Sequence, residues 1–73
     1  MTEEQINILI GQNLTKARER AGYKLKDLAE LVGVTYQQVQ KYEKGKNRLT
    51  AAKLVMFARA LLVEPSELLP EAF

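Results

Sequence analysis

Two residue types that often carry chemistry are missing from this chain, because its 73 residues include no cysteine and no histidine. Without cysteine it can form neither disulfide bonds nor thiolate metal sites. Without histidine it lacks the most common general base and the most common transition-metal ligand. Metal-assisted carboxylate chemistry is the one enzymatic reading left. The nine acidic residues are scattered at helical spacing with no cleft-forming pattern around a pair, so we expect no enzyme activity and no cofactor.

The chain also lacks a long apolar run. No stretch approaches the roughly 18 apolar residues that cross a bilayer, and the N-terminus MTEEQ has no basic signal-peptide start. We therefore expect a cytoplasmic protein that makes no membrane contact. The composition, 47% hydrophobic and 27% charged, is typical of globular proteins. A chain of this size buries about 60 to 65% of its unfolded surface, so we expect one domain over residues 1–73.

The net charge of +2 is small, but its distribution is uneven. Between Leu14 and Lys53 there are ten basic and four acidic residues, a net +6, whereas the two ends together carry −4. A basic centre with acidic ends suits a polyanion that is bound on one face through phosphate contacts. The alternative is an ordinary solvated surface of mixed charge.

Apolar residues recur at helical spacing along the whole chain, and no segment alternates for long with period two. The sequence therefore predicts an all-α protein. The first helix begins after Thr2, which is spaced from Gln5 as in a capping box, and Gly22 ends it. The second runs from about residue 25 to residue 32, and Gly33 ends it in the same way.

Three more helices follow. Thr35 repeats the capping-box spacing with Gln38, which places a third helix at residues 36–44, before Gly45. Thr50 caps a fourth helix, whose apolar stripe consists of Leu54, Phe57, Ala58 and Leu61. Pro65 suits the first position of a short fifth helix that extends to about Leu69.

The connection between the second and third helices has the length of a helix-turn-helix turn, because only residues 33–35 intervene. Ala29 is small enough for a close helix crossing, and Gly33 supplies a positive φ at little steric cost. Val39 and Tyr42, three residues apart, give the third helix an inward edge. Each feature is weak alone, but their combination within a five-helix pattern indicates a helix-turn-helix.

The chain resembles the Cro and phage-repressor family of helix-turn-helix DNA-binding proteins. The resemblance lies in IGQNLTKARERAG, LKDLAELVGVTYQQVQKYEKGKNRLT, LVMFARALLV and EPSELL. It implies a compact five-helix, lambda-repressor-like fold in which helices two and three form the helix-turn-helix. It also implies a transcriptional regulator, more often a repressor, that inserts helix 36–44 into the major groove of double-stranded DNA. Such regulators are usually homodimers on palindromic operators, and no small-molecule ligand is expected.

The resemblance also implies roles for individual residues. The residues expected to read bases are Tyr36, Gln37, Gln40 and Lys41. The residues expected to contact phosphate are Thr35, Lys44, Lys46, Asn47 and Arg48. Arg18 and Glu43 occupy the positions of a structural ion pair. One departure is Leu25, where the family commonly has a phosphate-binding glutamine, so Lys24 or Lys26 is expected to replace that contact.

The inward edge of the third helix leaves residues 36, 37, 40, 41 and 44 on its outer face. Gln37 can offer a bidentate amide to adenine, and Lys41 can reach guanine or a phosphate. Tyr36 can contact a thymine methyl group or a phosphate. The alternative is that the glutamines are ordinary solvated helix formers, and Gln38 fits a capping role better than a base-reading one.

A single short recognition helix reads few bases, so we expect a homodimer on half-sites about 34 Å apart. Its expected self-association surface is the apolar C-terminal third: Leu62, Val63, Leu68, Leu69 and Phe73. The competing hypothesis is a protein-interaction module, such as an antitoxin-type partner of another chain, in which the same apolar surface meets a different protein.

Overall fold

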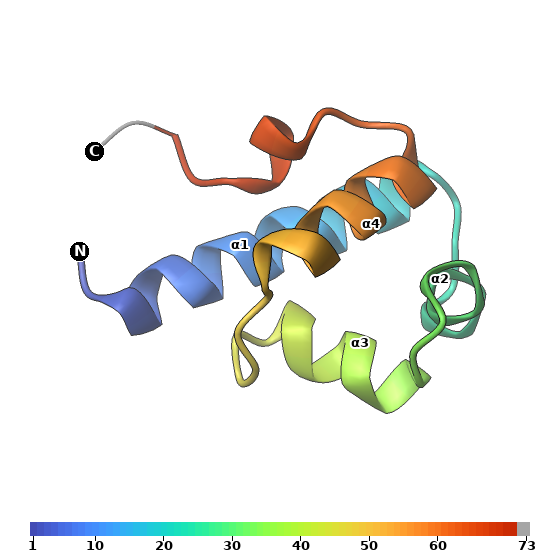
Figure 1. Ribbon diagram of the computed structural model, residues 1–73, viewed down its shortest axis with the longest axis horizontal. Helices are drawn as coiled ribbons and strands as arrows, with labels where there is room; N and C mark the ends of the chain where they lie inside the picture. Colours follow the sequence, from blue (N-terminus) through green and yellow to red (C-terminus); the bar gives the residue numbers. More distant parts are fainter. Residues whose placement is uncertain (72–73) are drawn as a thin grey trace.

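The computed structural model describes residues 1–71, which form four α-helices followed by one short 3₁₀ turn and contain no strand (Figure 1). The elements are α1 (Glu3–Arg20), α2 (Leu25–Val32), α3 (Tyr36–Glu43), α4 (Ala51–Leu61) and η1 (Pro65–Leu68). The α2 helix packs against α3 and α4, and η1 packs against α1 and α4. None of the helices described here is both long and apolar enough to span a bilayer.

Hydrogen-bonded caps fix the helix starts that the sequence predicts. The backbone N–H of Gln5 donates to Thr2 Oγ1 at 3.1 Å, while Gln5 Oε1 accepts from the Thr2 N–H at 2.9 Å. Thr35 and Gln38 form the same reciprocal pair at the start of α3, with the same two distances. Thr50 Oγ1 accepts the N–H of the residue three positions on, at 3.1 Å. The predicted starts of α1, α3 and α4 are therefore confirmed.

Glycines with a positive φ follow the first two helices. Gly22, which follows the C-cap Ala21 of α1, and Gly33, the C-cap of α2, adopt φ values of 79° and 80°. Residues with a Cβ adopt this conformation at a steric cost. The third helix ends at Glu43 with Lys44 as its C-cap, so α3 is one residue shorter than predicted.

One core lies between the helices. Among residues 1–71 no polar or charged residue is buried, and the largest fully buried side chain is Phe57 of α4. The ring of Tyr42 meets Phe57 edge-on, with centroids 5.7 Å apart and planes at 75°. The core residues are Leu14, Ala17, Leu28, Ala29, Val32, Val39, Phe57, Ala58, Leu61 and Leu68.

The prediction of a fifth α-helix is wrong, because Pro65–Leu68 form only a single 3₁₀ turn. Leu69 is extended, with φ −85° and ψ 151°, as expected for a residue that precedes a proline. Pro70 thus ends the turn before α-helical hydrogen bonding can begin.

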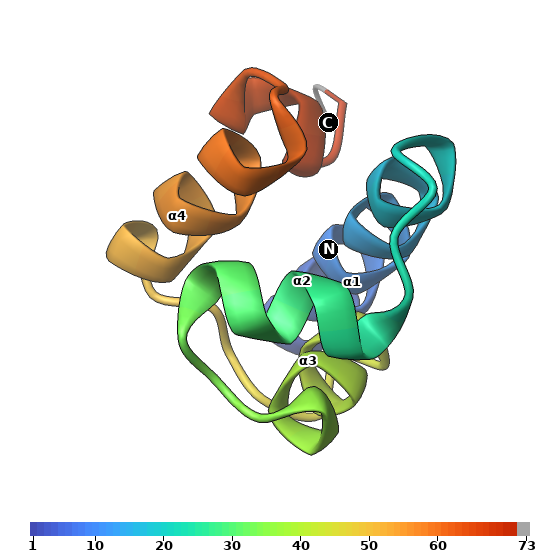
Figure 2. The ribbon, with the colours of Figure 1, turned by 90° about the vertical axis from the view of Figure 1, so that its right-hand side faces the viewer.

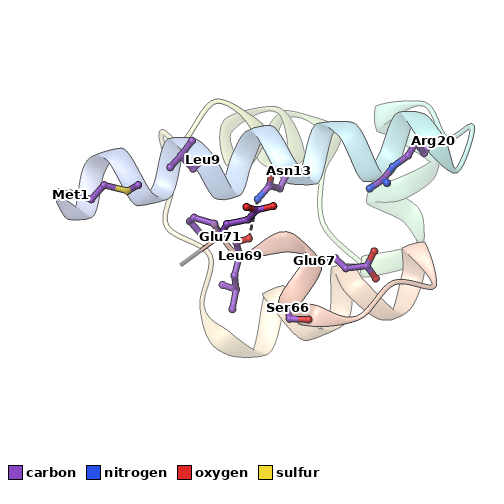
Figure 3. A pocket seen from close by; sticks show the side chains of 9 residues that line it. Met1, Leu9, Asn13, Arg20, Ser66, Glu67, Leu69 and Glu71 are labelled. Atoms are coloured by element: carbon purple, nitrogen blue, oxygen red, sulfur yellow. Dashed lines mark hydrogen bonds between the residues drawn. The ribbon is translucent and has the colours of Figure 1, made fainter. Parts of the chain in front are cut away.

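The prediction that Leu68 lies on a self-association surface is also wrong, since Leu68 is fully buried in the core. Asn13 of α1 fixes this segment, because its Nδ2 donates to the carbonyl oxygens of Leu68 and Leu69 at 3.2 Å each. Figure 3 shows Asn13 beside Leu69. Leu69 stays exposed, and Val63 packs against the core while partly exposed. Phe73 lies outside the described residues.

Candidate nucleic-acid interface

The turn between α2 and α3 is built on one carbonyl group. The oxygen of Ala29 accepts the N–H groups of Gly33 at 2.8 Å and Val34 at 3.0 Å. The left-handed conformation of Gly33 then reverses the chain, and Thr35 starts the next helix. Ala29 is small and buried, and α3 packs against α2, below it in Figure 2.

The inner edge of α3 is anchored against three other helices. Val39 is fully buried, and Tyr42 packs on Phe57 of α4. On the α1 side the contact is between backbones, since a Cβ added to Gly11 would lie 2.5 Å from the carbonyl oxygens of Tyr42 and Glu43. The last turn of α3 thus rests directly on α1, and only a glycine fits there.

An ion pair adds a second link between these two helices. Arg18 Nε donates to Glu43 Oε2 at 2.6 Å, and Nη2 donates to Oε1 at 3.2 Å. Arg18 Nη1 also donates to the carbonyl oxygen of Tyr23 at 2.9 Å, which holds the loop after α1. The two charged side chains are only 13% and 9% exposed. The hydrogen bond to Glu43 raises the pKa of Arg18 more than burial lowers it, so the guanidinium stays charged at neutral pH.

The outer face of α3 carries no acidic side chain, because Glu43 turns inward to Arg18. Gln38 is engaged at the N-cap by its hydrogen bonds with Thr35. The remaining polar residues make no side-chain hydrogen bond within residues 1–71, so their amides and ammonium groups are free. The predicted base-reading residues Tyr36, Gln37, Gln40 and Lys41 are all exposed on this face.

The residues predicted to contact phosphate flank α3. Lys24 and Lys26 lie at the start of α2, which is at the right of Figure 1, and the loop at residues 44–50 lies at the other end of α3. All the predicted phosphate residues are exposed: Thr35, Lys24, Lys26, Lys44, Lys46, Asn47 and Arg48. Arg48 is the only one of them with an ion-pair partner in the part of the chain described, since its Nη1 lies 3.2 Å from Glu3 Oε1.

Sequence reasoning missed two residues that shape this surface. Gly11 sets the approach of α3 to α1, and the only sequence signal was a glycine inside a helix, where it ordinarily costs about 0.5–1 kcal/mol relative to alanine. Glu3 meets Arg48 across 45 positions of sequence, which no local pattern reveals. Within residues 1–71 no group of three acidic side chains is arranged as metal ligands would be.

A family model described as helix-turn-helix matches residues 14–68. Among curated proteins, an uncharacterized HTH-type transcriptional regulator of Sinorhizobium fredii, y4wC, is 49% identical over 57 residues. That match covers 78% of this chain and 40% of the relative, so the chain spans less than half the length of the relative.

Solved structures share the fold. The restriction-modification controller protein C.AhdI from Aeromonas hydrophila superposes with a TM-score of 0.80 at 31% identity, over 84% of this chain and 92% of that protein. The DNA-binding domain of BldD superposes with a TM-score of 0.85 at 25% identity, over 94% of this chain and all of that domain.

The same arrangement of helices occurs within an enzyme. Hydroxypropylphosphonic acid epoxidase from S. wedmorenis matches with a TM-score of 0.90 and 27% identity. The match covers 96% of this chain but only 37% of the epoxidase. Likeness of fold therefore does not decide the function, which depends on the side chains that the fold exposes.

Proposed function

This chain belongs to the Cro- and phage-repressor-like helix-turn-helix family, and from that premise we propose that it is a sequence-specific regulator of transcription. It binds double-stranded DNA as one domain and inserts α3 into the major groove. The outer face of α3 is the observation that carries this proposal. Free amide and ammonium groups project from a helix whose opposite edge is held by Val39, Tyr42 and the Gly11 contact.

Base reading is assigned to the exposed face of α3. Gln37 supplies a bidentate amide for adenine, and Lys41 supplies a donor for guanine O6 and N7. Tyr36 and Gln40 complete the reading face. Discrimination of this kind is worth about 1–3 kcal/mol for each good bidentate contact, provided that the helix is held rigidly in the groove.

Phosphate binding is assigned to the two segments that flank α3. The cap of Thr35 occupies the N–H of Gln38, while the N–H groups of Tyr36 and Gln37 make no hydrogen bond within residues 1–71. They can bind a phosphate oxygen at the positive end of the helix dipole. The exposed cations of the two flanking segments add contacts that do not depend on sequence: Lys24, Lys26, Lys44, Lys46 and Arg48, together with the amide of Asn47.

We assign a homodimer on a palindromic operator, acting as a repressor. Two exposed leucines, Leu62 and Leu69, support self-association. Leu62 is 89% exposed and adopts a left-handed conformation with φ 58°, which is costly for a residue with a branched side chain. A large apolar side chain that is exposed to solvent favours a contact with a second copy, which would cover it.

Selection of bound duplexes from a random pool tests the proposal. We expect enrichment of two inverted half-sites whose centres lie about 34 Å, or one helical turn, apart. A matched selection with Gln37→Ala should lose preference at one or two positions of each half-site. Failure to enrich any sequence would refute sequence-specific binding, and enrichment of a single unrepeated site would refute the symmetric dimer.

A further inference from the structure

The first turn of α1 places an acidic side chain beside a loop that is otherwise basic. Glu3 accepts from Arg48 Nη1 with both carboxylate oxygens, at 3.2 and 3.3 Å. The two side chains are 72% and 71% exposed, so solvent and other ions reach the pair. Together with Glu4, Asn7 and Ile8 of α1 and with Lys44, Gly45 and Lys46 of the loop, they line one hollow on the surface.

The neighbourhood of Glu3 and the loop is fixed by packing. A Cβ added to Gly45 would lie 2.8 to 2.9 Å from atoms of Ile8, so the loop lies directly on the second turn of α1. The capping box of Thr2 and Gln5 holds the first turn of the helix in place. In Figure 1 the loop hangs below the N-terminal half of α1. The packing therefore holds the N-terminal part of α1, which carries Glu3, next to the loop that carries Arg48.

We propose that Glu3 competes with DNA phosphate for Arg48 and thereby weakens the binding of this protein to every DNA sequence. This inference rests on the proposed function, in which Arg48 contacts phosphate. A phosphate that reaches the Arg48 guanidinium must either displace the Glu3 carboxylate or lie next to it. The first costs an ion pair and the second brings two negative charges together, so both oppose binding. Because phosphate contacts carry no sequence information, the operator and unrelated DNA are affected alike.

The size of the effect follows from the exposure of the pair. Ion pairs at the surface contribute little and are screened by salt. We therefore expect Glu3→Gln to raise the affinity for DNA roughly two- to fivefold at low salt. The gain should shrink at physiological salt, where the Debye length is about 8 Å.

The experiment measures binding to a duplex of mixed sequence, so that no operator has to be known. Glu4→Gln is the matched control, because it removes the same charge from the same helical turn. Glu4 forms no ion pair or hydrogen bond through its side chain within residues 1–71. Both variants lose one favourable charge at the helix N-terminus, which thermal unfolding records separately.

A third variant, Arg48→Ala, tests whether Glu3 acts through Arg48. We expect Glu3→Gln to strengthen binding more than Glu4→Gln does, and this difference should disappear when both are made in the Arg48→Ala background. Equal gains from the two glutamine variants would show that the pairing of Glu3 with Arg48 has no effect of its own and would overturn the inference. A difference that persists without Arg48 would overturn it as well. If the unaltered protein binds no duplex at all, the proposed function fails first and the inference falls with it.

Discussion

Replacing Gly11 with alanine adds one methyl group at the closest approach of α1 and α3. In an ordinary helix interior this change stabilises a protein by about 0.5–1 kcal/mol, because glycine loses more backbone freedom on folding. Here the new Cβ would lie 2.5 Å from the carbonyl oxygens of Tyr42 and Glu43, well inside the 3.4 Å at which ordinary contacts begin. Both oxygens belong to the backbone, so neither can rotate away.

The helices must therefore separate by several tenths of an ångström or more. Overpacking of this kind costs about 1–3 kcal/mol, and a clash with two backbone atoms falls toward the upper part of that range. After subtraction of the gain in helix propensity, we expect a net loss of about 1–2 kcal/mol in the free energy of unfolding. For a domain of this size that corresponds to a fall of roughly 5–15 °C in Tm.

Thermal unfolding followed by circular dichroism measures this loss. Gln12→Ala is the control, because Gln12 is the exposed neighbour in α1 and its replacement tests helix propensity alone. We expect Gln12→Ala to leave Tm nearly unchanged. A Gly11→Ala protein as stable as the unaltered one would refute the backbone contact between α1 and the end of α3.

Four further changes test the site and its support. Gln37→Ala should relax sequence preference at one or two operator positions, with an unaltered circular dichroism spectrum; unchanged discrimination would remove Gln37 from the reading face. Lys46→Ala should weaken binding to all sequences alike and lower the salt dependence by about one ion, so an unaltered salt slope would contradict its phosphate role. Leu62→Gly should raise the free energy of unfolding of the monomer by about 0.5–1 kcal/mol, because glycine adopts a positive φ without strain. The same change should shift the sedimentation profile toward monomer. An unchanged dimer affinity would show that Leu62 is not part of the interface. Glu43→Gln should lower the free energy of unfolding by about 1.5–3 kcal/mol, since Arg18 keeps its charge but loses a charged hydrogen-bond partner. An unchanged midpoint of chemical denaturation would contradict this prediction.

Local chemistry explains why the elements were predictable from the sequence. Thr2, Thr35 and Thr50 each cap a helix through the N–H three residues on, a contact that spacing alone specifies. Gly22 and Gly33 end α1 and α2 because few other residues adopt a positive φ cheaply. Such signals lie within a few residues of the feature they determine.

Burial within the C-terminal segment was not predictable in the same way. Leu68 and Leu69 are adjacent, and a four-residue 3₁₀ turn has no periodicity that distinguishes the inward residue from the outward one. The position of this segment depends on Asn13, because its amide donates to the two carbonyl groups from a helix more than fifty positions earlier. The contacts of Gly11 and Glu3 were likewise not predictable, because the residues that they meet are distant in sequence.

The inner edge of α3 packs against the rest of the protein, and its outer edge is exposed. With eight residues, α3 is too short to be stable alone, because isolated helices below about 12–15 residues are marginal in water. Its stability therefore comes from Val39, Tyr42, Glu43 and the close approach to Gly11. Since the outer residues make no side-chain hydrogen bond or ion pair within residues 1–71, apart from the Gln38 cap, they can change with little effect on folding. If the proposed function holds, specificity for DNA and stability of the fold are separable by mutation, except where a change on the inner edge displaces the whole helix.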